Sequence, residues 1–260
     1  MKKIYSKPEE FKIADGLVSR YTGEATVLEI PEGVTCVASM AFSLKRNIVE
    51  AVLPESLEEI CSYAFTGNRE LQIVKFPKGL KEIGSRAFKE TGLASVNLPE
   101  GVAVLPEGVF EYCKSLKRVK LGKKLVKIGG FAFYQCSSIK EIELPSGVAE
   151  IGYHAFQGCV ALASISLGES LQTIGIEAFA GCKKLKKVSF PSTLKKISGG
   201  AFEGCEKLSE IVLQEGLEVI EENAFKDCNL LKRVRIPSTV KVLDRTAFPA
   251  STIIEWVKIE

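Results

Sequence analysis

The sequence has very little of what most enzymes use for chemistry. It contains one histidine, His154, and no nucleophile motif accompanies it. Schemes that pair a base with a nucleophile depend on histidine most often, so His154 is interpreted as a solvated turn residue. No Gly-x-Gly-x-x-Gly follows an expected strand, and Gly-x-x-x-x-Gly-Lys-[Ser/Thr] is absent. We therefore expect no enzymatic activity and no cofactor.

Long apolar runs and a charge excess are also missing. No run approaches the roughly 18 apolar residues of a membrane span, and no apolar segment of the kind found in signal peptides follows Lys2 and Lys3. The 35 basic residues nearly balance 32 acidic ones, and there is no aromatic stripe for single-stranded nucleic acid. We expect neither membrane insertion nor nucleic-acid binding, and the printed chain by itself predicts a cytoplasmic protein.

The eight cysteines contain no Cys-x-x-Cys pair, which structural zinc sites normally show. Cys36 and Cys61 lie on either side of an aliphatic position and out of register with each other. The other six recur with a constant period, which predicts small buried side chains in a reducing compartment; disulfides between repeats, a metal site or oxidation sensing are alternatives. These six are Cys113, Cys136, Cys159, Cys182, Cys205 and Cys228.

What the sequence does have is an internal repeat, marked by the dipeptide Ala-Phe. Val109-Phe110 fills one gap in the series. The sequence numbers of successive Phe residues in this series differ by 23, except those of Phe88 and Phe110, which differ by 22. A repeat of this length indicates a solenoid. The Phe positions are Phe42, Phe65, Phe88, Phe110, Phe133, Phe156, Phe179, Phe202, Phe225 and Phe248.

Two aliphatic residues with one residue between them recur with the same period. This spacing with β-branched residues predicts a short strand, and in seven of eleven copies a proline follows and ends it. The first copy is Leu28/Ile30 and the expected eleventh copy is Val257/Ile259.

A further aliphatic column, from Val37 and Ile60 to Leu243, leads into the segment Gly-x-x-Ala-Phe-x-x-Cys. Its apolar positions at i, i+1 and i+4 predict a short helical turn. Each unit is thus expected to form a strand, a turn, a short helical segment and a return. One unit cannot bury its apolar side alone, whereas stacked units share a continuous core.

The pattern Leu-x-x-Val-x-Leu-Pro-x-x-Leu-x-x-Ile-Gly-x-x-Ala-Phe-x-x-Cys over residues 26–259 resembles the BspA-like, or Treponema-type, leucine-rich repeats. The resemblance implies an α/β solenoid: a right-handed superhelix of about ten to eleven 23-residue repeats, each with one short parallel strand and one short helical turn. Residues 1–25 would form an amino-terminal cap, and residues 26–260 a single solenoid domain.

The side chains that point outward from the strands are the predicted binding surface. Arg118 faces Glu141 on the neighbouring strand and Lys120 faces Glu143, which predicts cross-strand ion pairs. Exposed Trp and Arg are enriched in binding hot spots. The candidate partner-binding residues are Val52, Ile73, Arg118, Lys120, Lys187, Arg233, Arg235, Trp256 and Lys258.

We therefore expect a non-catalytic, protein-binding repeat module that presents its strand face to a macromolecular partner. The resemblance implies adhesion at bacterial or protist cell surfaces, or a secreted protein, with a host or matrix protein as partner. This functional step is analogy, because a fold does not fix a function. An intracellular scaffold, or the repeat segment of a larger multidomain protein, is the alternative.

Overall fold

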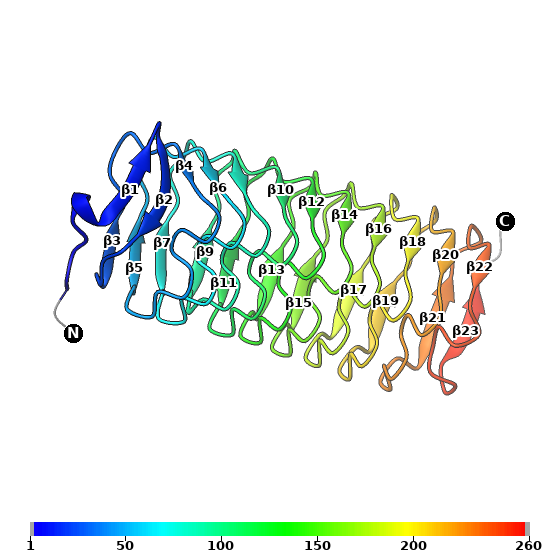
Figure 1. The fold of residues 1–260 in the computed structure, drawn as a ribbon. Helices are drawn as coiled ribbons and strands as arrows, with labels where there is room; N and C mark the ends of the chain where they lie inside the picture. The colour runs from blue at the N-terminus through cyan, green and yellow to red at the C-terminus, as the bar shows by residue number, and fades with distance from the viewer. Residues whose placement is uncertain (1–2, 258–260) are drawn as a thin grey trace.

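A computed structural model describes residues 3–257 and shows a solenoid whose ends lie far apart (Figure 1). The chain winds in about ten coils, each one sequence period long, as the repeat predicted. Each coil contributes strands to two rows that run along the length of the molecule. The rows are held together by parallel pairing between successive coils.

The first row consists of the strands predicted from the alternating aliphatic pairs. Pairing is parallel and in register, so that Leu28 lies opposite Ala51 and Ala51 opposite Val74. Beyond the three-stranded sheet β3-β5-β7, this row pairs only two strands at a time. The strands are β3 (Val27–Glu29), β5 (Glu50–Val52), β7 (Ile73–Lys75), β9 (Ser95–Asn97), β11 (Arg118–Lys120), β13 (Glu141–Glu143), β15 (Ser164–Ser166), β17 (Lys187–Ser189), β19 (Glu210–Val212), β21 (Arg233–Ile236) and β23 (Ile253–Trp256).

A second row of two-residue strands follows the further aliphatic column, and the expectation of one strand per repeat was wrong. Two residues are too few to show an alternating pattern in the sequence. Strands β10 to β22 form one seven-stranded sheet. The second row contains β4 (Cys36–Val37), β6 (Glu59–Ile60), β8 (Glu82–Ile83), β10 (Val104–Leu105), β12 (Lys127–Ile128), β14 (Glu150–Ile151), β16 (Thr173–Ile174), β18 (Lys196–Ile197), β20 (Val219–Ile220) and β22 (Val242–Leu243).

The short helical turn expected around each Ala-Phe was also wrong. Among residues 3–257 the structure assigns one helix, the 3-10 segment η1 (Pro8–Glu10). Around Ala-Phe the backbone N–H groups bond to the next coil, as Phe133 does to the Ala155 carbonyl at 2.8 Å. The residues two before and two after Phe133 have positive φ, 56° for Phe131 and 58° for Gln135. Left-handed residues at this spacing interrupt a right-handed helix.

The core is a stack of the repeated Phe rings. From Phe42 to Phe248, neighbouring rings lie 5.0–5.8 Å apart with interplanar angles of 2–20°. The widest spacing, 5.8 Å, is between Phe88 and Phe110, where the repeat is one residue short. The short repeat therefore loosens the stack slightly without breaking it.

A β-hairpin precedes the first coil at the amino-terminal end (Figure 1). Strand β1 (Phe11–Ala14) pairs antiparallel with β2 (Leu17–Tyr21), and β2 pairs in parallel with β4. Phe11 and Tyr21 are cross-strand neighbours, and both rings pack near Phe42, at 6.3 and 5.9 Å. The first ring of the core stack is thus covered by aromatic side chains of the hairpin.

The register at the carboxyl end differs from the expected one. Val234 lies opposite Ile254 and Ile236 opposite Trp256, so the inward pair of β23 is not Val257/Ile259. Arg233 follows Phe225 by eight positions, whereas Ile253 follows Phe248 by five, so the last coil is shorter and the strand starts earlier. Ile259 and the candidate Lys258 lie outside the described residues.

Candidate functional site

The residues predicted for the strand face do not form one patch. Val52 in β5 is half-buried and Ile73 in β7 is 47% exposed, both near the amino-terminal end. Arg118 and Lys120 lie in β11 and Lys187 in β17, separated by several coils. Trp256 is not in the outward column of Arg233, because it lies opposite the buried Ile236.

Several of these cations are engaged in ion pairs. Lys187 contacts Glu210 of the next coil at 2.6 Å. Arg233 contacts Glu255, and Arg235 Nε lies 3.6 Å from the other oxygen of the same carboxylate. Exposed pairs of this kind contribute about 0–1 kcal/mol to stability. They also reduce the local positive charge that would attract an acidic partner.

The ion pairs expected between β11 and β13 were wrong. Within the part of the chain that the structure describes, neither Arg118 nor Lys120 has a carboxylate within 4.0 Å. The two strands belong to different sheets, so their side chains are not held at pairing distance. A groove of about 490 Å³ lies there instead, lined by Arg118, Glu141, Glu143 and the edge of β15. The strand face therefore offers a polar groove at mid-length.

A cluster of aromatic rings, which the sequence patterns did not single out, lies on successive turns at the middle of the solenoid. Phe131 packs edge to face against Tyr134 and Tyr153, at 5.4 and 5.1 Å, and stacks on His154 at 4.8 Å. Tyr112 meets Tyr134 edge to face at 5.2 Å. These five residues are called the aromatic cluster below. Its rings are half-buried except Tyr153, which is 44% exposed.

The repeat geometry brings these rings together. Phe131 and His154 occupy the same position of consecutive coils, two residues before the core Phe, with φ of 56° and 53°. The Phe131 N–H donates to the Tyr153 carbonyl at 2.9 Å. A Cβ atom at Gly130 would lie 2.6 Å from the Tyr153 ring, so glycine is required for that ring to pack there.

His154 is therefore not the solvated turn residue that the sequence suggested. Its ring stacks on Phe131 and meets Tyr153 edge to face, and its Nδ1 is buried with no hydrogen-bond partner among residues 3–257. Glu177 Oε2 is 3.5 Å from that nitrogen. Packing in the cluster, and not exposure to water, determines its environment.

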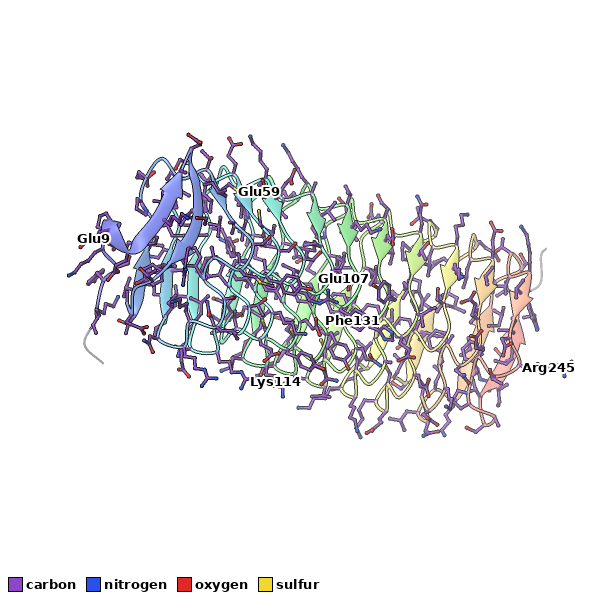
Figure 2. The ribbon with its side chains drawn as sticks, viewed as in Figure 1. Glu9, Glu59, Glu107, Lys114, Phe131 and Arg245 are labelled. Carbon is purple, nitrogen blue, oxygen red and sulfur yellow. The ribbon has the colours of Figure 1, made fainter. Side chains whose placement is uncertain are left out.

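Charged groups border the cluster on its amino-terminal side. Arg86 contacts Glu107 and also Glu111, the latter at 3.2 Å, and Lys89 binds the other Glu111 oxygen at 3.0 Å. Lys89 Nζ also lies 5.5 Å from the centre of the Tyr112 ring, within cation–π range. Phe131, Glu107 and Lys114 mark this central region in Figure 2.

A hollow of about 450 Å³ adjoins the cluster at Tyr112 and reaches Arg69, Glu90 and Lys114. Burial raises the pKa of the Tyr112 and Tyr153 phenols. Both hydroxyls therefore remain protonated at neutral pH and can donate hydrogen bonds. Apolar rings with polar edges beside a charged hollow suit contact with another protein.

Comparison with known proteins now gives the family. The family model described as BspA type leucine-rich repeat region (6 copies) matches residues 35–163 and 150–260. The chain belongs to this family. The BspA-type repeat is a leucine-rich repeat, a fold that serves generally as a protein-interaction module. No curated protein matches the sequence.

Solved structures of leucine-rich-repeat proteins resemble the BspA-type chain. The T. pallidum leucine-rich-repeat protein is 30% identical with a TM-score of 0.65, over 70% of this chain and 91% of that one. A leucine-rich-repeat protein from Eubacterium ventriosum is 16% identical with a TM-score of 0.50, over 94% and 90% of the two chains. A leucine-rich cell surface protein from Faecalibacterium prausnitzii is 24% identical with a TM-score of 0.47, over 94% and 90%.

Within residues 3–257, no helix is long and apolar enough to span a bilayer. The position of the aromatic cluster could have been found from the sequence by aligning the coils. Its residues stand where other coils carry serine, glycine or glutamate, for example Ser85, Gly108 and Glu177. Aromatic residues at these variable outward positions of neighbouring coils were the sequence signal that could have indicated the cluster.

Proposed function

We propose that this BspA-type solenoid is a non-catalytic protein-binding module and that its partner contacts the aromatic cluster. The packing of five rings at half-exposed positions on the turns is the observation that supports this. Tyr side chains, which combine a large apolar face with a polar hydroxyl, are enriched in interface hot spots. The edge-to-face contacts hold the rings in place, so little side-chain entropy is lost on binding.

The strand-face residues support a second contact surface. Arg118 lines the groove between β11 and β13, and Lys120 lies on the same strand. Neither has a carboxylate partner among the described residues. Lys187, Arg233 and Arg235 are already paired with carboxylates. Val52, Ile73 and Trp256 are apolar and do not line this groove. We therefore place the polar part of the strand-face contact at β11.

The class of partner follows from the family resemblance alone. A host or matrix protein, bound at a cell surface or after secretion, is the partner that adhesion would require. An intracellular scaffold, or the repeat segment of a larger protein, would use the same surfaces with another protein. The module is proposed to bind a protein in each case, and the identity of the bound protein distinguishes these roles.

Two experiments test the proposal: binding to purified matrix proteins, and pull-downs from host and bacterial lysates. Both compare the wild type with a double variant whose new residues already occur at the same positions of other coils. Phe131→Asn is tolerated because Asn223 occupies the same left-handed position, and Tyr153→Ser has its counterpart in Ser85. We expect the double variant to lose affinity for a captured partner by roughly 10-fold or more, the loss of one hot-spot contact.

Met40→Asn is the matched control, because Met40 occupies the same position of the first coil and is 60% exposed. It should leave binding unchanged.

The variant Arg118→Glu tests whether the strand face contributes to binding. Unchanged binding by the Phe131→Asn/Tyr153→Ser variant would remove the aromatic cluster as the contact, and a loss only in Arg118→Glu would move the site to the strand face.

A further inference from the structure

Two cysteines and a glutamate meet on the outer surface of the second row of strands. Cys36 in β4 lies directly opposite Glu59 in β6, and Cys61 is two residues after Glu59. Glu59 and Cys61 therefore project on the same side, with the buried Ile60 between them. The Cys36 and Cys61 sulfur atoms are 3.7 Å apart, and Cys61 Sγ lies 3.3 Å from Glu59 Oε1. Figure 2 marks Glu59 on this edge of the solenoid.

The sequence pattern gave no indication of this meeting, because the two cysteines lie more than one period apart and out of register. The structure brings them together diagonally across one pair of parallel strands. Unlike the six cysteines of the core, both are only partly buried. Reagents and ions in solution can therefore reach them.

The spacing of the three donor atoms matches a tetrahedral metal site. With zinc–sulfur bonds of about 2.3 Å and zinc–oxygen bonds of about 2.1 Å, tetrahedral angles place two sulfurs ~3.8 Å apart and sulfur and oxygen ~3.6 Å apart. The observed 3.7 and 3.3 Å are close to both values, and all three donor atoms lie within 4.8 Å of one another. Little side-chain movement is needed to enclose an ion.

We propose that Cys36, Glu59 and Cys61 bind a thiophilic divalent metal ion of the zinc class. Two thiolates and one carboxylate supply three ligands, and the fourth position is left to water or to a donor group of a bound partner. Thiolate ligands select zinc-like ions over calcium and magnesium, which prefer oxygen ligands. The site goes beyond protein binding by the aromatic cluster and does not depend on it.

The charges around the site favour a cation. Glu82 in β8 lies directly opposite Glu59, and the described residues include no ion pair for either carboxylate. As a divalent ion forms bonds to the two sulfur atoms, the two thiol protons pass to solvent.

Cobalt(II) titration of the full chain, kept reduced with a phosphine, tests the site. Cobalt(II) alone is the probe, because thiolate ligands give it a charge-transfer absorption band that aliphatic carboxylates do not. We expect the band to saturate at one ion per chain, with two protons released, and zinc to displace the cobalt. Glu59→Gln should weaken cobalt binding by roughly 10-fold or more.

Cys36→Thr and Cys61→Ser should abolish the band, and both are compatible with folding because Thr173 and Ser198 occupy the same positions of other coils. Glu150→Gln, at the position of Glu59 in β14, is the matched control and should bind cobalt like wild type. No band in the reduced wild type, or an undiminished band in Cys61→Ser, would overturn the assignment.

Discussion

The cysteines three residues after the core Phe form hydrogen bonds that explain their recurrence. Each thiol, from Cys113 to Cys228, donates to the Phe carbonyl of the preceding coil at 3.0–3.3 Å. Asn68 fills the same position and donates to the Phe42 carbonyl at 2.9 Å. The position therefore requires a small side chain that can also donate a hydrogen bond, which cysteine satisfies with little desolvation.

The state of these thiols leads to a prediction about their reactivity. Cys113 and Cys159, like the other four cysteines of the core, are fully buried, so a reagent cannot reach their thiols in the native protein. Alkylation of the native, metal-free protein with a maleimide, followed by intact mass measurement, should add two groups, at Cys36 and Cys61. In denaturant all eight should react.

The variant Cys36→Thr/Cys61→Ser is the control for that count and should add none in the native state. Labelling of the six core cysteines without denaturant would show that the coils open readily, contrary to the packing described. The burial of these six was predictable from the period alone. The contact between Cys36 and Cys61 was not, because it depends on the diagonal arrangement of side chains across paired strands.

At the scale of elements, the turns show where sequence periodicity misleads. Apolar positions at i, i+1 and i+4 suit a helix, yet the same residues also suit a coil whose N–H groups bond to the next coil. The decisive feature is the left-handed backbone on both sides of Phe, as at Phe131 and Gln135. Large non-glycine residues rarely adopt positive φ, so their presence at these positions does not indicate a left-handed backbone. The sequence therefore predicted a helix, which was wrong.

The β-hairpin at residues 11–21 is proposed to be the amino-terminal cap expected from the sequence. Phe11 and Tyr21 face each other across the strands and pack near Phe42, whereas Lys12 and Arg20, the next pair, are both exposed. Removing the two rings would expose the end of the Phe stack. We expect Phe11→Ser/Tyr21→Ser to lower the free energy of unfolding by about 3 kcal/mol or more, measured by urea denaturation.

The matched variant Lys12→Ser/Arg20→Ser replaces a cross-strand pair of the same hairpin and should change stability by about 0.5 kcal/mol or less. Equal stability of the two double variants would show that the hairpin does not protect the first coil. Self-association of the ring-deleted variant, seen by sedimentation, would be consistent with an uncovered solenoid end.

At the scale of the whole molecule, the period predicted the solenoid, the number of coils and the buried Phe stack. A strict repeat leaves few other ways to bury the same face in each unit. The surface was predicted less well, because side chains there are set by local pairing. Interrupted sheets separate Arg118 from Glu141, and a shortened last coil moves Trp256 out of the column of Arg233.

The central claim is that each coil buries its apolar side only against its neighbours, and a deletion of one full period tests it most directly. Removing residues 157–179 joins Phe156 to Ala180 and restores the register of every column. Urea denaturation should show a cooperatively folded protein whose m value is lower by roughly one tenth, because m scales with the surface buried. Removing residues 157–167 breaks the register and should prevent folding. Equal loss of folding in both deletions would contradict the account.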